Sequence, residues 1–171
     1  LIERPTVEIP GERGAVMRDE HAAQEAEFEK LRAAGSAVRV CAPSRLHFGM
    51  FSFGHSDRPQ YGGVGVMVSP RAVDVHFLPA AKFEVGGAHA ARVLQSVEVV
   101  LDRWHVDASP SCKIEVAAPP DHTGLGVGTQ LALAVAAGLR RFLRLPQLAA
   151  TELSVQLGRG GRSAVGTYGF E

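Results

Sequence analysis

The sequence PPDHTGLGVGTQ at residues 119–130 sets the organisation of the chain around it. It follows a strand-like run at residues 112–117 and precedes an apolar, helix-like run that begins at Leu131. The glycines therefore open a helix, whose first turn has several backbone N–H groups without partners at the positive end of its dipole. Such a helix start favours binding of an anion, most often a phosphate. Glycine is expected there because a side chain would hold the anion away from the amides and would disfavour positive φ angles.

The residues of this loop are candidate phosphate ligands: Gly124, Leu125, Gly126, Val127, Gly128, Thr129 and Gln130. Thr129 is also the candidate metal ligand, since its hydroxyl can reach a phosphate oxygen or a bound magnesium ion. The loop lacks the Gly-Lys-Ser/Thr ending of a Walker loop and the arrangement that a dinucleotide site requires. A glycine-rich turn that only connects strand to helix is the alternative. Three glycines on alternate positions directly before an apolar helix exceed what such a turn needs.

The composition excludes several classes of protein. With 171 residues, 46% of them hydrophobic, the chain can bury a full core. Its 18 basic and 18 acidic residues give a net charge of zero, and this balance gives no support to nucleic-acid binding. No signal peptide is evident, and the apolar run from Leu131 is broken by Gly138 and Arg140 before it could span a membrane.

Cys41 and Cys112 lie in apolar, strand-like runs without a paired spacing, which predicts buried thiols in a reducing compartment, the cytoplasm. The histidines have no ligand spacing with cysteines or carboxylates, so no zinc site is predicted. The chain has no initiator methionine and stops at Glu171 in mid-pattern, so we interpret it as a fragment. We expect an extended lead and a solvated helix over residues 1–36. A domain over residues 37–171 would follow, without its carboxy-terminal partner.

Hydrophobic periodicity predicts an α+β fold. The expected strands are residues 38–41, 45–51, 61–68, 72–78, 83–85 and 112–117. The expected helices are residues 17–34, 88–105, 131–143 and 149–157. Ser69 and Pro70 are expected to turn the chain, so that residues 72–78 pair back on the strand before them. This order predicts an antiparallel or mixed sheet covered by helices on one face, rather than a doubly wound sheet.

Two strands carry further candidate residues. Arg45 and His47 share one face of a strand, because alternate residues point the same way, and together they can bind an anion or supply a proton. For His47, the residues alone favour a structural, hydrogen-bonded histidine over a functional one. Tyr61, Gly62 and Gly63 lie in a strand whose missing side chains indicate that another backbone or a ligand packs close.

The glycine-rich ending at residues 158–169 carries Arg159, Arg162 and Ser163. Two guanidinium groups among glycines are suited to holding phosphates or a carboxylate through paired hydrogen bonds. A solvated basic loop is the alternative.

Four motifs together resemble the β-ribofuranosylaminobenzene 5′-phosphate synthase family of the GHMP kinase superfamily. They are PSRLHFG at 43–49, YGGVG at 61–65, GLGVGTQLA at 124–132, and the glycine-rich run at 158–169. The third resembles the ATP-binding-like phosphate motif of the superfamily, and all four occur in the family's order. The resemblance covers residues 38–171. It implies the amino-terminal domain of a GHMP kinase, which is like the second domain of ribosomal protein S5.

The resemblance also implies a reaction. A ribosyl phosphate group would pass from 5-phosphoribosyl-1-pyrophosphate to 4-aminobenzoate or 4-hydroxybenzoate, with loss of carbon dioxide and pyrophosphate, in tetrahydromethanopterin biosynthesis. Arg45 and His47 would be catalytic, and Tyr61, Gly62, Gly63, Arg159, Arg162 and Ser163 would bind substrate. We expect magnesium, no organic cofactor, and small-molecule partners without nucleic acid or membrane. A homodimer is left open.

Two departures from the superfamily bear on the activity. Val127 stands where serine is usual, so the loop loses one hydroxyl. Residues 158–170 contain no carboxylate, whereas the kinases take their catalytic aspartate from the corresponding loop, and this argues against phosphoryl transfer to a hydroxyl. An ATP-dependent small-molecule kinase, recognised by ATP turnover, is the first alternative. A non-catalytic phosphometabolite-binding protein, which would release no carbon dioxide, is the second.

Overall fold

The structure, a computed structural model, describes residues 12–54, 61–106, 109–120, 123–159 and 165–170. Its elements run in the order α1 (Glu12–Ala33), β1 (Val38–Ser52), β2 (Tyr61–Pro79), β3 (Glu84–Gly87), α2 (Ala90–Arg103), β4 (Cys112–Ala117), α3 (Val127–Phe142), α4 (Ala150–Gln156) and α5 (Val165–Tyr168). One sheet has the strand order β1-β2-β4-β3. β3 and β4 are parallel and the other pairs are antiparallel, so the predicted mixed sheet is confirmed.

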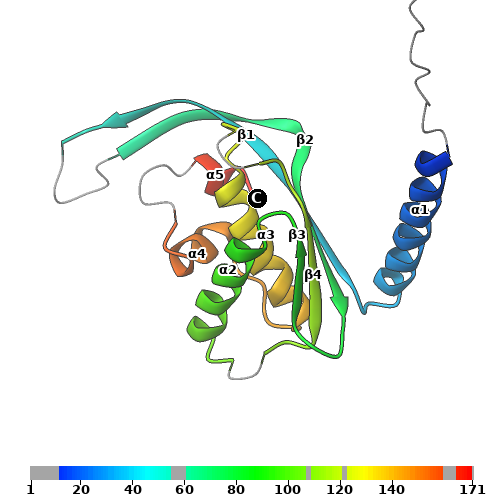
Figure 1. Cartoon of the computed structure of the whole chain (residues 1–171). Coiled ribbons are helices and arrows are strands. Elements are labelled where there is room, and N and C mark those ends of the chain that lie inside the picture. Colours follow the sequence, from blue (N-terminus) through cyan, green and yellow to red (C-terminus); the bar gives the residue numbers. More distant parts are fainter. Residues whose placement is uncertain (1–11, 55–60, 107–108, 121–122, 160–164, 171) are drawn as a thin grey trace, which may run out of the picture.

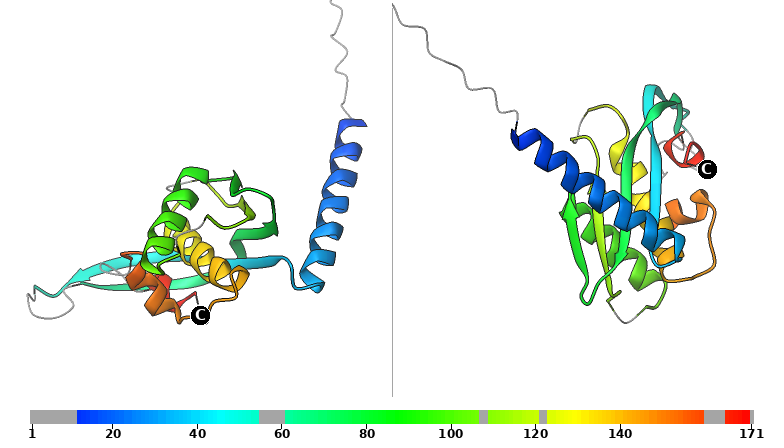
Figure 2. Two further views of the ribbon diagram at one scale, coloured as in Figure 1. Left: turned by 90° about the horizontal axis from the view of Figure 1, so that it is seen from below. Right: turned by 90° about the vertical axis from the view of Figure 1, so that its right-hand side faces the viewer.

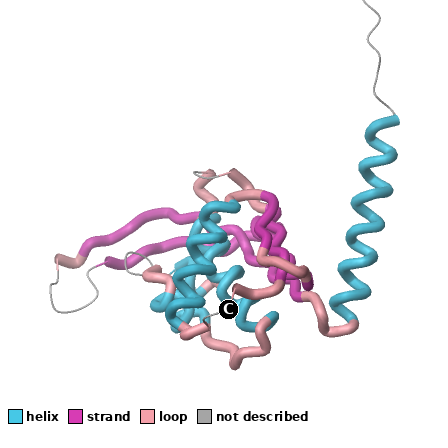
Figure 3. Tube along the Cα trace, turned by 60° about the horizontal axis from the view of Figure 1, so that its bottom comes forward, coloured by secondary structure: helices cyan, strands magenta, loops and turns pink. Residues whose placement is uncertain are grey.

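The sheet and the helices form two layers. α2, α3 and α4 cover one face of the sheet, and α1 lies on the other side, separated from them by the strands (Figures 1 and 2). β1 and β2 continue past the helices as a long two-stranded hairpin, as the tube in Figure 3 shows. Among the described residues, none of the helices combines the length and apolar character needed to cross a membrane.

The core lies between the sheet and α2 and α3. Alternation along β2 sends Val73, Val75 and Phe77 into the core, where all three are fully buried. α3 is buried over most of its length, and its Gly138 lies directly over the ring of Phe77. A Cβ at this position would overlap that ring, so Gly138 lets the helix approach the sheet closely.

The first two strands are longer than the sequence predicts. β1 is one strand rather than two, and β2 continues through Ser69 and Pro70, so the predicted turn there is wrong. β2 pairs with β1 instead of folding back on itself. Register shifts flank Pro43, and on the facing strand the pairing passes from Val68 to Arg71. Pro70 fits into this bulge because a bulged residue need not donate to the ladder.

The glycine-rich ending also differs from the prediction. It contains a short helix, α5, in which Gly166 and Thr167 are buried. The buried Gln130 side chain of α3 holds this helix, with Nε2 donating a 2.7 Å hydrogen bond to the Gly166 carbonyl. Long-range packing of this kind leaves no periodic signal in a four-residue helix.

α1 begins five residues before the predicted start, and most of its described side chains, from Ala22 onward, are exposed. Its contact with the sheet is nevertheless specific. Phe28 is 3% exposed and stacks on the ring of His76, with 4.3 Å between ring centroids. Glu25 accepts a 2.7 Å hydrogen bond from Arg39 of β1. Ala22 and Ala26 of the same helix are exposed.

Candidate functional site

The glycine loop connects β4 to α3 as the sequence predicts. Gly126 is the residue that precedes the helix, with φ 70°, and Gly124 has φ 77°. Both values lie in the left-handed region that only glycine adopts readily, so the positive φ angles expected for the loop are confirmed. The first turn of α3 has no acidic residue that would neutralise the positive end of the helix.

A pocket of about 480 Å³ lies at the start of α3. The residues that line it come from β1, α2, the glycine loop and the end of α4: Arg45, His47, Arg92, Thr123, Gly124, Leu125, Gly126, Val127, Gly128, Thr129 and Arg159. Three of them are arginines, and the described lining contains no carboxylate. The structure therefore brings most of the predicted site residues together around an open, strongly basic concavity.

Arg45 is held against the loop by its backbone and its side chain. Its N–H donates a 2.8 Å hydrogen bond to the carbonyl of Leu125. Its Nε lies 3.0 Å from the position that a Cβ on Gly126 would occupy. This Nε is buried and has no hydrogen-bond partner in the described part of the chain. A buried donor left in this way costs about 1–3 kcal/mol, which favours a ligand that accepts its hydrogen bond.

Arg92 and Thr123 line the pocket but were not predicted. Arg92 belongs to the first turn of α2, and its Nη1 lies 3.2 Å from the position of a Cβ on Gly128. Arg92 could have been identified from the order and direction of the strands. Because β3 and β4 are parallel, the start of α2 and the loop after β4 meet at the same edge of the sheet.

Arg159 follows α4 and is exposed at the rim of the pocket. Its backbone N–H donates a 2.7 Å hydrogen bond to the carbonyl of Ser154, which fixes where the loop leaves the helix. Arg162 and Ser163 lie outside the described residues, so their predicted roles stay predictions.

The loop residues take different positions. Thr129 lines the pocket, and Val127 does so although its side chain is 5% exposed, which leaves mainly its backbone available to a ligand. Gln130 does not line the pocket and is fully buried, with its amide bonded to α5. Gln130 thus positions α5 rather than facing the candidate ligand.

Tyr61, Gly62 and Gly63 lie on the projecting hairpin, where they pair with Ser52, Phe51 and Met50. None of the three lines the pocket at the start of α3. The ring of Phe53 covers Gly62, with Cε2 at 2.9 Å from the position of a Cβ there. At Gly62 the group that packs close is thus a side chain of the same chain, not the backbone or ligand that the sequence predicts.

Magnesium fits the pocket only in a limited way. Mg²⁺ prefers oxygen ligands and is commonly held by substrate phosphates together with one or two protein groups. Thr129 offers such an oxygen, but the described lining has no carboxylate beside it. The described residues also contain no cluster of histidine, cysteine and carboxylate side chains that could hold a metal ion. This donor set fits a magnesium ion that enters with a phosphorylated substrate.

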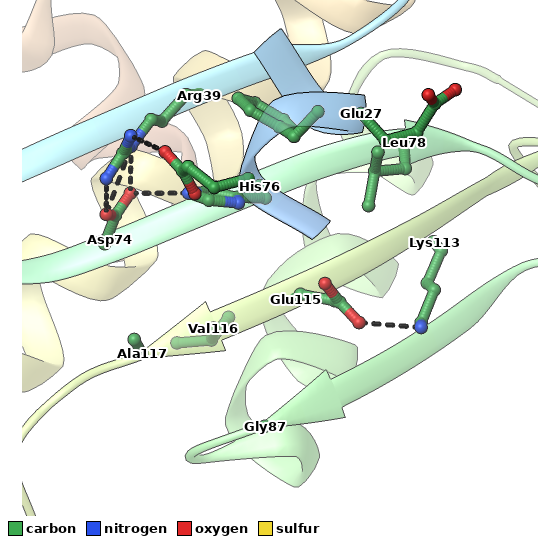
Figure 4. Close-up of a pocket in the computed structure, with 12 residues that line it drawn as sticks. Glu27, Arg39, Asp74, His76, Leu78, Gly87, Lys113, Glu115, Val116 and Ala117 are labelled. Atoms are coloured by element: carbon green, nitrogen blue, oxygen red, sulfur yellow. Dashed lines mark hydrogen bonds and ion pairs between the residues drawn. The ribbon is translucent and has the colours of Figure 1, made fainter. Parts of the chain in front are cut away.

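A second concave region lies on the opposite face of the sheet, between β1, β2, β4 and α1 (Figure 4). Its polar groups bind one another: Arg39 Nη2 lies 2.6 Å from Asp74 Oδ2, and Lys113 Nζ lies 2.6 Å from Glu115 Oε1. Burial alone would raise the pKa of the Asp74 carboxyl, but the hydrogen bonds from Arg39 and the nearby His76 hold that pKa below its usual value. These mutual ion pairs are typical of a structural surface.

Comparison with known proteins identifies distant relatives. No known family profile matches the chain. Two curated proteins named β-ribofuranosylphenol 5′-phosphate synthase are similar to it. The protein from Archaeoglobus fulgidus is 27% identical over 135 residues, which cover 78% of this chain and 42% of that protein. The protein from Methanothermobacter thermautotrophicus is 29% identical over 143 residues, which cover 77% and 43%. The chain thus spans less than half the length of these relatives.

Solved structures of kinases share the fold. Methanococcus jannaschii mevalonate kinase matches with a TM-score of 0.59 at 12% identity, over 80% of this chain and 51% of the kinase. A putative sugar kinase from Campylobacter jejuni matches with a TM-score of 0.57 at 15% identity, over 73% and 44%. Streptococcus pneumoniae phosphomevalonate kinase gives 0.54 at 8% identity, over 72% and 40%. The chain therefore shares the fold of these kinases, as the resemblance stated from its sequence implies.

Proposed function

We propose that this chain forms part of an enzyme that transfers a ribosyl phosphate group from 5-phosphoribosyl-1-pyrophosphate to a 4-substituted benzoate. Carbon dioxide and pyrophosphate leave, and a C-riboside forms, as a step in tetrahydromethanopterin biosynthesis. The observation that carries the proposal is the convergence of three arginines on the start of α3, in a pocket whose described lining has no carboxylate. Such a site matches a substrate with several phosphate groups.

Electrostatics support a polyanionic ligand. Arg45, Arg92 and Arg159 add their charges to the positive end of the α3 dipole, and no acidic side chain in the first turn of that helix opposes them. Like charges gathered in this way repel one another, so an anion that lies among them lowers the free energy of the site. The buried Nε of Arg45 adds a specific hydrogen-bond donor.

The proposed chemistry needs this positive charge at the leaving group. The bond between the anomeric carbon and the pyrophosphate oxygen breaks, and its electron pair leaves with pyrophosphate. The ring carbon that carries the carboxylate bonds to the anomeric carbon. The bond to the carboxylate then breaks, carbon dioxide departs, and the electron pair of that bond restores the aromatic ring. Arginines and backbone amides that stabilise the departing pyrophosphate lower the barrier to the first step.

The pocket residues can be assigned to these needs. The loop amides and Thr129 would bind the pyrophosphate group, and a magnesium ion, when bound, would add further charge neutralisation. Arg45 and His47 would lie beside the reacting centre as donors to oxygen atoms of the substrates. Net proton transfer is not required by the reaction, so His47 is proposed to orient an anion. Arg159, with Arg162 and Ser163, would bind the second phosphate group or the benzoate carboxylate.

The names of the relatives favour one acceptor. Both describe the synthesis of a ribofuranosylphenol 5′-phosphate. Decarboxylating transfer to 4-hydroxybenzoate gives a phenol, whereas the same transfer to 4-aminobenzoate gives an aniline. For this chain, we therefore propose 4-hydroxybenzoate as the preferred acceptor.

An ATP-dependent small-molecule kinase is the second candidate, and the fold shared with the kinases favours it. A kinase of this type needs a carboxylate near the attacking hydroxyl to accept its proton. The described lining of the pocket offers no such group. The basic pocket therefore supports the ribosyl transfer more strongly.

Product analysis with the full-length protein tests the proposal. The protein is incubated with phosphoribosyl pyrophosphate, magnesium and each benzoate in turn, and the products are identified by mass spectrometry. We expect the decarboxylated ribosyl phosphate of the phenol, formed together with pyrophosphate. Consumption of ATP with a small alcohol, without any ribosylated product, would instead identify a kinase. Binding of the phosphoribosyl substrate without turnover would identify a non-catalytic binding protein.

A further inference from the structure

We infer that Arg92 of α2 acts with Arg45 as a two-sided clamp that selects a diphosphate over a single phosphate at the glycine loop. The inference rests on the proposed function, since it assigns the pyrophosphate group of the substrate to a defined part of the same pocket. It adds a specificity-determining residue that lies on an element outside every sequence motif described above.

The side chain of Arg92 lies close to the backbone of the loop at Gly128. Nη1 of Arg92 lies 3.2 Å, and its Cζ 3.9 Å, from the position of a Cβ on Gly128. Gly128 belongs to the first turn of α3 and does not have a positive φ angle. The backbone there would accept alanine, so the conformation does not require glycine. The close approach of the guanidinium group is the structural feature that the missing side chain permits.

An unusual residue fixes the start of α2 beside the loop. His89, directly before α2, has φ 59° in the left-handed region, although it is not a glycine. Its Nε2 donates a 2.7 Å hydrogen bond to the carbonyl of Pro119, at the beginning of the loop. The backbone N–H of Arg92 in turn donates a 2.9 Å hydrogen bond to the carbonyl of His89. These hydrogen bonds connect the start of α2, and with it the backbone of Arg92, to the beginning of the loop.

Arg45 makes the matching contact on the other glycine. Its Nε lies 3.0 Å from the Cβ position of Gly126, two residues before Gly128. The two arginines come from different elements, β1 and α2, and each lies against one glycine at the start of the same helix. A single phosphate presents its oxygens around one phosphorus atom. A diphosphate presents two such groups, so each guanidinium can form charge-assisted hydrogen bonds with a separate group.

Calorimetric titration of the full-length protein with inorganic pyrophosphate and with inorganic phosphate tests the clamp. We expect Arg92→Gln to weaken pyrophosphate binding by roughly tenfold or more, because a charge-assisted hydrogen bond is lost, and to change phosphate binding much less. Arg103→Gln is the matched control. Arg103 lies exposed in the last turn of the same helix, and its substitution removes the same charge as Arg92→Gln does. It should bind pyrophosphate within about twofold of the unchanged protein, since exposed charges at this separation are screened.

Gly128→Ala provides a second variant that keeps every charge. Its Cβ would lie 3.2 Å from Arg92 Nη1, so the guanidinium has to shift by a few tenths of an ångström; we expect weaker pyrophosphate binding while the melting temperature is kept or raised. If Arg92→Gln binds pyrophosphate as tightly as Arg103→Gln does, or loses phosphate and pyrophosphate affinity equally, the clamp is refuted.

Product formation is measured in parallel. A protein that forms no ribosylated phenol but shows Arg92-dependent pyrophosphate binding would refute the proposed function and leave the clamp standing.

Discussion

At the scale of single residues, two loop glycines make room for arginine side chains. The sequence indicates that glycine lets a phosphate approach the amides, and the structure adds that Gly126 and Gly128 also let Arg45 and Arg92 lie against the helix start. The loop, its positive φ angles and the basic strand residue Arg45 could all be predicted. Arg92 could not, because α2 carries it among ordinary amphipathic positions and only the tertiary packing brings it to the loop.

Gly126→Ala should affect both stability and binding. The left-handed φ of 70° makes alanine unfavourable by about 1–2 kcal/mol. The new Cβ would also lie 3.0 Å from Arg45 Nε, so the Arg45 side chain has to shift by a few tenths of an ångström from its place against the loop. We expect a lower midpoint of urea unfolding and at least a severalfold loss of pyrophosphate affinity.

Gly35→Ala is the control for this variant. Gly35 also has φ 70°, and a Cβ there would meet no atom within 4 Å. The control should lose similar stability and keep its pyrophosphate affinity. Equal affinity in both variants would show that the contact between Gly126 and Arg45 has no part in binding.

Cys112 and Cys41 should differ in reactivity. Cys112 is fully buried, and burial raises the pKa of its thiol to about 11, so the reactive thiolate is scarce at neutral pH. Cys41 is only partly buried, with its thiol 3.5 Å from Asp74. Titration with a thiol reagent at pH 8 should label Cys41 first and Cys112 only on unfolding. Rapid labelling of both thiols in the folded protein would contradict the buried position of Cys112.

At the scale of the elements, β1 and β2 show what periodicity can and cannot reveal. The alternation along residues 72–78 predicts which side chains enter the core, and the structure confirms it for Val73, Val75 and Phe77. The continuity of each strand could not be predicted, because proline is a turn signal in local sequence. Only the facing strand, which supplies a matching bulge around Pro43, makes a long strand compatible with these prolines.

α1 shows the same limit in a helix. The sequence predicts a solvated helix, and most of the described side chains of α1, from Ala22 onward, are exposed. One aromatic side chain and one carboxylate nevertheless attach it to the sheet, through Phe28 on His76 and Glu25 on Arg39. Two contacts of this kind, the ones made by the described side chains of α1, give no periodic signal of a docking face.

The free energy of unfolding should depend on pH through Asp74, on the face of the sheet that carries the ion pairs. Its pKa is lowered in the folded state, so the folded protein binds this proton less readily than the unfolded chain, whose aspartates have pKa values near 3.9. The stabilisation is therefore complete above about pH 4 to 5, and it is lost as the pH falls through the folded value.

Asp74→Asn tests this dependence. We expect the variant to lose about 1 kcal/mol at pH 7, because the pair with Arg39 is partly exposed, and we expect this difference to shrink as the pH falls below about 4. Glu27→Gln is the control, because its pair with Lys30 is highly exposed and 3.7 Å long. Urea unfolding followed from pH 3 to pH 8 measures both variants. A constant difference between Asp74→Asn and the unchanged protein at every pH would show that the carboxylate charge is not the cause.

At the scale of the whole molecule, the parallel pairing of β3 and β4 assembles the site. This pairing puts the start of α2 and the glycine loop at one edge of the sheet, while the β1–β2 ladder presents Arg45 and His47 to the same edge. The sequence predicts a mixed or antiparallel sheet but does not specify which strands are parallel. The parallel pairing of β3 and β4 therefore explains why α2 contributes Arg92 to the pocket.

The chain matches less than half the length of its curated relatives, so its activity has to be measured on the full-length protein. The most direct test uses 4-hydroxybenzoate labelled in the carboxylate carbon, with magnesium and with or without phosphoribosyl pyrophosphate. The account predicts labelled carbon dioxide only when phosphoribosyl pyrophosphate is present, in equal amount to the pyrophosphate released. Retention of the label in the benzoate, while the protein remains folded and consumes ATP with a small alcohol, would contradict it.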